Sequence, residues 1–130
     1  MLVVDDDAPV LEAMTLVLRH FGARVTATAS VSEALAALGR ERPDVLLSDL
    51  RMPGADGYDL IRRVRALPPD RGGRTPAAAV SGHGGLEARR ALRRGFHLHI
   101  AKPVEANTLA NAVRLLAGLQ RGAADWAAAS

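Results

Sequence analysis

The chain of 130 residues contains no cysteine, which excludes disulfides, thiolate metal sites and cysteine nucleophiles. Aromatic residues make up only 3% of it, and no apolar run approaches the roughly 18 residues that a membrane helix needs. No signal peptide is recognisable ahead of the first apolar run. We therefore expect one cytoplasmic domain, or the cytoplasmic part of a larger protein, with no membrane partner.

Lysine is nearly absent from a chain that is otherwise basic. The 17 basic residues comprise 16 arginines and the single lysine Lys102, and the net charge is +3. Arginine pairs at 62–63, 89–90 and 93–94 lie inside stretches with helical periodicity, which is typical of solvated helix faces. Because no helix-turn-helix or RNA-binding motif accompanies them, we do not expect direct nucleic-acid binding. A basic nucleic-acid-binding module is kept as an alternative.

Five short apolar or β-branched runs are predicted to be strands, and helical periodicity follows each of them. The strands are expected at residues 1–4, 24–29, 45–48, 77–80 and 98–101. The helices are expected at residues 8–21, from a cap at Ser30 or Ser32 to just before Pro43, and at 58–67, 86–94 and 108–119.

Strands that alternate with helices through short loops predict right-handed crossovers and a doubly wound parallel sheet. The expected fold is α/β and flavodoxin-like, with five strands in the order 2-1-3-4-5 and five helices. Residues 1–119 would form this domain, and residues 120–130, which carry no pattern, a C-terminal tail or linker. The fold places a crevice at the carboxyl ends of strands 1 and 3.

Chemically reactive side chains stand at the carboxyl ends of the predicted central strands. They are Asp5 and Asp6 after strand 1, Asp49 after strand 3, Ser81 after strand 4 and Lys102 after strand 5. Each alone could be a cap, a turn residue or a surface charge, but their joint placement at one edge favours a functional site. Three carboxylates so close together need a compensating cation, and hard oxygens that water can reach suit Mg²⁺ (or Mn²⁺).

A carboxylate beside Mg²⁺, a hydroxyl and an ammonium group is equipped to accept a phosphoryl group. Asp49 would attack in line, while the metal and the ammonium group of Lys102 neutralise charge on the equatorial oxygens. An alternative is a haloacid-dehalogenase-like phosphatase, which pairs an Asp-x-Asp motif, such as that of residues 5–7, with a Ser/Thr and a Lys. That alternative leaves Asp49 unexplained and needs a further acidic motif after the lysine, where Glu105 is the only acidic residue ahead of the tail of residues 120–130.

Four separate motifs match a known family, in order and at family spacing. From Leu2 to about Leu119 the chain resembles the receiver domain of two-component response regulators. The resemblance implies a phosphoacceptor switch domain rather than an enzyme, apart from its own phosphorylation and dephosphorylation. The matching segments are Val3-Val4-Asp5-Asp6, Asp49-Leu50-Arg51-Met52-Pro53 with Gly54 and Asp56-Gly57, Ser81, and Lys102-Pro103.

The resemblance also implies a role for each residue of the acidic site. Asp49 would be the phosphoacceptor, and Lys102 would hold a phosphate oxygen. Asp6 would bind Mg²⁺ directly and Asp5 mainly through water. Asp49 itself and the backbone carbonyl of Arg51 would be further metal ligands.

The remaining positions of the family pattern would surround this site. Ser81 would hydrogen-bond the phosphate, and the peptide bond before Pro103 would be cis. His99 falls on the family's switch position and would report phosphorylation to the face made by helix 4, strand 5 and helix 5. Arg51 and His83 would lie at the rim of the pocket, at positions that influence dephosphorylation.

The family implies a partner that carries a phosphohistidine, either a sensor histidine kinase or a histidine phosphotransfer protein. Residues 95–104 look like receivers attached to hybrid sensor histidine kinases. We therefore expect either a fragment of such a kinase or a stand-alone regulator. A phosphorylation-dependent homodimer is compatible with both arrangements.

Overall fold

The computed structural model describes residues 1–82 and 85–129, with side chains described as far as Leu119. Strands and helices alternate along these residues. No helix among them combines the length and the apolar character needed to cross a membrane. In chain order the elements are β1 (Leu2–Val4), α1 (Ala8–His20), β2 (Thr26–Thr28), α2 (Val31–Glu41), β3 (Leu46–Asp49), α3 (Gly57–Arg65), a short 3-10 helix η1 (Pro69–Arg71), β4 (Ala77–Ser81), α4 (Gly85–Arg94), β5 (Leu98–Ala101) and α5 (Ala106–Ala129).

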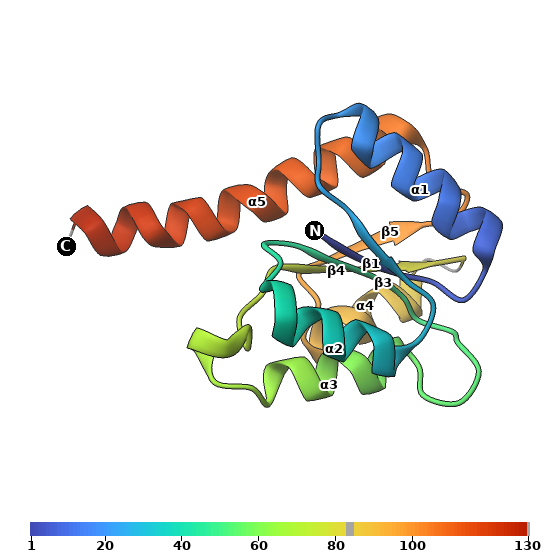
Figure 1. Cartoon of the computed structure of the whole chain (residues 1–130), viewed down its shortest axis with the longest axis horizontal. Coiled ribbons are helices and arrows are strands. Elements are labelled where there is room, and N and C mark those ends of the chain that lie inside the picture. The colour runs from blue at the N-terminus through green and yellow to red at the C-terminus, as the bar shows by residue number, and fades with distance from the viewer. Residues whose placement is uncertain (83–84, 130) are drawn as a thin grey trace.

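The strands form one parallel sheet in the order β2-β1-β3-β4-β5, which confirms the predicted fold (Figure 1). β1 pairs with both β2 and β3, so it lies beside the strand that ends in Asp49. The strand predicted at residues 24–29 is shorter in the structure, where β2 covers Thr26–Thr28. β2 is an edge strand, and its neighbour β1 is only three residues long, so the two strands pair over three residues.

Helices cover both faces of the sheet and give the domain three layers (Figure 1). Helices α2, α3 and α4 pack on one face, and α1 and α5 on the other. Successive strand residues alternate between the two cores: Leu2 and Val4 pack under α2 and α3, whereas Val3 packs under α1 and α5. Because both faces are covered, the central strands appear in the sequence as continuous apolar runs.

Three helices begin at side chains that cap their first turn. Asp7 accepts a hydrogen bond from the amide three residues on at 3.3 Å, and Ser30 does the same at 3.2 Å, so Ser30 rather than Ser32 caps α2. At the start of α3, the side chains of Asp56 and Asp59 each accept the other's backbone amide, which forms a capping box. These caps satisfy amides that have no partner inside the helix.

The last helix differs from the prediction. We expected it at residues 108–119, but α5 runs from Ala106 to Ala129 and projects beyond the sheet (Figure 1). Alanine, which has the highest helix propensity, recurs at positions 123, 124 and 127–129 and explains a helical backbone where no apolar pattern exists. A linker can itself be helical, so the division into a domain of residues 1–119 and a tail or linker of residues 120–130 stays a prediction.

Candidate functional site

The carboxyl edge of the sheet gathers the side chains that the sequence singled out. Asp49 is the last residue of β3 and Ser81 the last of β4. Asp5 directly follows β1, and Lys102 directly follows β5. The four strands are parallel, so all these residues lie at the same edge.

Three carboxylates lie together at this edge. Oxygens of Asp5, Asp6 and Asp49 all lie within 4.8 Å of one another. Asp5 is fully buried and Asp49 is 5% exposed, whereas Asp6 is open to solvent. Mg²⁺ prefers hard, charged oxygen ligands and keeps several of its own waters. The donor set, with one exposed carboxylate, therefore fits the metal that the sequence predicts.

The single lysine of the chain brings positive charge to these carboxylates. Lys102 Nζ lies 3.1 Å from Asp5 Oδ2 and 3.5 Å from Asp49 Oδ1. Burial by itself would lower the pKa of Lys102, but the hydrogen bonds and negative charges of Asp5 and Asp49 outweigh burial and raise this pKa. The side chain is therefore a charged ammonium group that contacts both buried carboxylates.

The ammonium group of Lys102 does not fully offset the effects that raise the pKa of Asp49. Burial raises the pKa of Asp49 most strongly, and the negative charge of Asp5 raises it further. Lys102 and the backbone amide of Arg51, which donates to Asp49 Oδ1 at 3.4 Å, lower this pKa without cancelling the rise. The site thus has an excess of negative charge that a divalent cation would neutralise.

Ser81 and His99 contact each other across neighbouring strands. Ser81 Oγ lies 2.7 Å from Nε2 of His99, which brings the imidazole from β5 to the end of β4. Ser81 is 2% exposed, and His99 is half-buried. The structure therefore joins the predicted phosphate-binding hydroxyl to the predicted switch residue, while His83, predicted at the rim, lies outside the described residues.

Two further predicted positions border the carboxylates. The Lys102–Pro103 peptide bond is cis. Arg51 lies in the loop after β3, and its side chain turns toward α4, where Nη2 lies 3.3 Å from Glu87 Oε2. That the Arg51 carbonyl binds metal stays a prediction.

Sequence reasoning missed Glu87. Its partner Arg51 lies 36 residues away in the chain, so no local spacing connects the two. The one signal was that Glu87 is the sole acidic residue in the arginine-rich segment that forms α4. Such a residue in the first turn of a helix is readily explained by the helix dipole alone.

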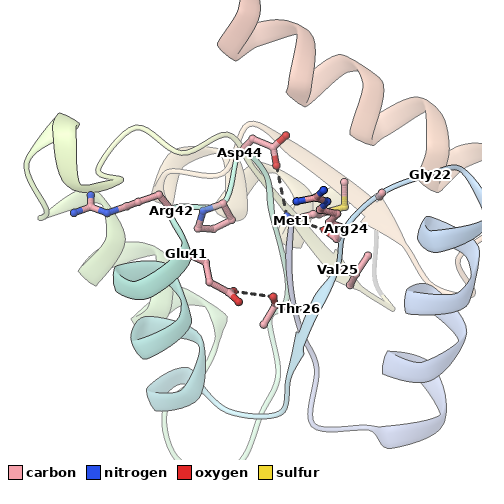
Figure 2. A pocket seen from close by; sticks show the side chains of 10 residues that line it. Met1, Gly22, Arg24, Val25, Thr26, Glu41, Arg42 and Asp44 are labelled. Carbon is pink, nitrogen blue, oxygen red and sulfur yellow. Dashed lines mark hydrogen bonds and ion pairs between the residues drawn. The ribbon is translucent and has the colours of Figure 1, made fainter.

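A pocket of about 590 Å³ lies at the opposite edge of the sheet (Figure 2). It is lined by residues at the start of β1 and β2 and after α2, and in it Thr26 Oγ1 donates a hydrogen bond to Glu41 Oε2 at 2.7 Å. None of the described residues that we predicted for the site lines this pocket. It is therefore separate from the carboxylate site.

Comparison with known proteins agrees with this geometry. Residues 1–114 match the family described as response regulator receiver domain. An uncharacterized 14.6 kDa protein of Leptolyngbya boryana is 44% identical over 105 residues, which are 80% of this chain and 79% of that protein. The receiver domain of NtrX from Brucella abortus has a similar structure, with a TM-score of 0.81 and 30% identity over 90% of this chain and 97% of that one.

Longer regulators match over part of their length. The C4-dicarboxylate transport transcriptional regulatory protein DctD of Rhizobium meliloti is 39% identical over 112 residues, which are 85% of this chain. The same residues are 24% of DctD, so the chain spans about a quarter of that regulator's length. With the family match over residues 1–114 and the parallel 2-1-3-4-5 sheet, these likenesses show that the chain belongs to the response regulator receiver domains of two-component signal transduction.

Proposed function

We propose that Asp49 accepts a phosphoryl group from a phosphohistidine and that the domain thereby switches conformation. The observation that carries the proposal is the position of Asp49 at the end of β3, with the Lys102 ammonium group 3.5 Å from its carboxylate. Asp5 and Asp6 stand at the same edge with oxygens in metal-binding reach. A nucleophile, a fixed cation and an oxygen-rich metal site are what phosphoryl transfer to a carboxylate requires.

The reaction is an in-line substitution at phosphorus. An oxygen of Asp49 forms the new O–P bond as the P–N bond of the phosphohistidine breaks. The leaving imidazole nitrogen keeps the electron pair of that bond, and the product on Asp49 is an acyl phosphate. The Lys102 ammonium group would then contact a phosphoryl oxygen, and the Ser81 hydroxyl would donate a hydrogen bond to another.

Asp5, Asp6 and Asp49, with the backbone carbonyl of Arg51, would hold Mg²⁺ (or Mn²⁺). The bound ion supplies positive charge against the phosphoryl oxygens. Asp5 is already oriented for this purpose, because its Oδ1 accepts the backbone amide of Asp7 at 2.9 Å while its Oδ2 accepts from Lys102.

His99 would convey the state of Asp49 to the surface. Its ring contacts Ser81, so a Ser81 hydroxyl that turns to the phosphoryl group would leave the ring without this partner. His99 lies on β5, and β5 packs against both α4 and α5. A change in the position of the ring would therefore alter the face made by these three elements.

The partner that donates the phosphoryl group would be a sensor histidine kinase or a histidine phosphotransfer protein. Membership of the receiver family favours neither a haloacid-dehalogenase-like phosphatase nor a nucleic-acid-binding module. The same chemistry would serve a stand-alone regulator, a longer regulator such as DctD, or the receiver of a hybrid kinase, and a phosphorylation-dependent homodimer is compatible with each.

Incubation with acetyl phosphate and Mg²⁺, followed by measurement of the intact mass, tests the proposal. Wild type should gain the mass of one phosphoryl group, and Asp49→Ala should gain none. A wild-type protein that binds Mg²⁺ and shows no mass change would contradict the proposal. An Asp49→Ala protein that gains the same mass as wild type would also contradict it, since the nucleophile would then be another residue.

A further inference from the structure

An ion pair connects the loop after the phosphoacceptor strand to helix α4. Arg51 Nη2 lies 3.3 Å from Glu87 Oε2. The two partners are unlike in exposure: the Arg51 side chain is 73% exposed, whereas that of Glu87 is 12% exposed. Glu87 is thus a largely buried carboxylate that holds the end of an otherwise solvated arginine.

Glu87 pairs with Arg51 although another arginine lines the same pocket. Both residues line a pocket of about 450 Å³ with Tyr58 and Arg90. The Arg90 guanidinium stacks 5.1 Å from the centre of the Tyr58 ring. Among the described residues, Arg51 is the cation within ion-pair distance of Glu87.

Arg51 is also close to the acidic site. It follows Asp49 by two residues, and its own backbone amide donates to Asp49 Oδ1 at 3.4 Å. An arginine side chain is long and flexible, and its guanidinium group pairs readily with carboxylates. A guanidinium group released from Glu87 would be attracted to the carboxylates of Asp5, Asp6 and Asp49, since Arg51 is only two residues from Asp49 in the chain.

We propose that Glu87 is a positioning residue for the reaction at Asp49. Glu87 holds the guanidinium group of Arg51 on α4 and so keeps this cation out of the carboxylate cluster. Inside the cluster, the guanidinium group would compete with the divalent metal. The inference rests on the proposed function of the cluster as a Mg²⁺ site. It also makes metal affinity depend on α4, since any displacement of α4 that separates the pair frees Arg51.

A double-mutant cycle measured by calorimetric titration with MgCl₂ tests this inference. Glu87→Gln should weaken Mg²⁺ binding by roughly three- to tenfold, the effect of one unit charge brought within several ångströms of the site. Arg51→Gln removes the guanidinium group but keeps the backbone carbonyl that is proposed as a metal ligand, so it should bind Mg²⁺ at least as tightly as wild type. In the Arg51→Gln background, Glu87→Gln should change the affinity less than twofold, because the competing cation is gone.

The control variant is Glu105→Gln, which removes an exposed carboxylate from the loop after Lys102 and leaves the Arg51–Glu87 pair intact. It should change the Mg²⁺ affinity less than twofold. Equal weakening by Glu87→Gln in both backgrounds, or no weakening in the wild-type background, would overturn the inference and leave the proposed function standing. Absence of Mg²⁺ binding by wild type would overturn both.

Discussion

The hydroxyl of Ser81 and the Nε2 atom of His99 lie 2.7 Å apart, so the end of β4 is joined to β5 through two side chains. Ser81 is almost fully buried, and His99 is half-buried. The Ser81 hydroxyl contacts the His99 ring, so it can donate a hydrogen bond to an incoming phosphoryl oxygen only if this contact is broken or shared. Phosphorylation at Asp49 and the orientation of His99 should therefore be coupled.

Replacing Ser81 tests this coupling. Ser81→Ala should accept a phosphoryl group from acetyl phosphate about tenfold more slowly, because one hydrogen bond to a charged oxygen is lost. In the unphosphorylated protein, the ¹⁵N shift of His99 Nε2 should change at the same time. Ser81→Thr keeps the hydroxyl and should keep most of the rate. An unchanged rate in Ser81→Ala would show that the hydroxyl does not contact the phosphoryl group.

Asp49→Asn should stabilise the metal-free protein. Burial and Asp5 raise the pKa of Asp49, so the ionised carboxylate destabilises the folded state. We expect a gain on the order of 1 kcal/mol in the free energy of unfolding, within the range that stabilising substitutions commonly reach. The gain should be complete above the raised folded pKa and should vanish as the pH falls toward the ordinary value of 3.8.

Urea unfolding in EDTA at several pH values measures this gain. Asp70→Asn, in the exposed η1 turn, serves as the control and should have no such effect. Added Mg²⁺ should stabilise wild type more than Asp49→Asn, because the variant has lost a metal ligand. Lower stability of Asp49→Asn in EDTA would mean that Lys102 compensates Asp49 completely.

The surroundings of His97 lead us to expect a second dependence of protein stability on pH. Its Nδ1 accepts the backbone amide of Ala77 at 3.1 Å, which requires an unprotonated nitrogen. Burial, and next the charge of Arg65, lower the pKa of His97 below its ordinary 6.5. Between the lowered folded pKa and about pH 6.5, the unfolded chain therefore binds a proton that the folded protein does not bind.

The contribution of His97 to stability should thus be complete above about pH 6.5 and should decrease as the pH falls toward the lowered folded pKa. Urea midpoints between pH 5 and 8 measure it. His97→Asn should flatten this part of the profile, and His20→Asn, at an exposed position of α1, should not. An identical pH profile for wild type and His97→Asn would refute the assignment.

Gly57 is expected to tolerate no side chain. A Cβ atom there would collide with the carbonyl oxygen of Asp49 and would lie 2.9 Å from the Leu50 Cα. Gly57→Ala should therefore lower the free energy of unfolding by roughly 2 kcal/mol or more, because the backbone around the added methyl group has to move. Gly39→Ala, inside α2 with no neighbour within 4 Å, should instead raise it by about 0.5–1 kcal/mol. Chemical denaturation of both variants provides the comparison.

The sequence was sufficient to predict the parallel sheet and to predict which residues lie at its carboxyl edge. Continuous apolar runs mark strands covered on both faces, and parallel strands bring their ends together, so Asp5, Asp49, Ser81 and Lys102 could be placed at one edge without coordinates. The cap of α2 remained open between two serines, because either could precede the helix. The structure shows that the Ser30 hydroxyl accepts the backbone amide of Glu33.

The contact between the loop after β3 and helix α4 could not be predicted. The Arg51–Glu87 pair joins residues that share no spacing or motif, and the pattern of α4 by itself indicates a solvated arginine face. The length of α5 was missed for another reason. Apolar periodicity stops before residue 120, and the helix beyond it rests on alanine propensity rather than on packing.

The most direct measurement of the central claim identifies the phosphorylated aspartate. Borohydride reduces an aspartyl phosphate to homoserine, so treatment after incubation with acetyl phosphate and Mg²⁺ labels the nucleophile for peptide mass spectrometry. We predict homoserine at position 49 in wild type, and none anywhere in Asp49→Asn. Homoserine at Asp5, or at Asp6, would contradict the assignment of Asp49 as the phosphoacceptor.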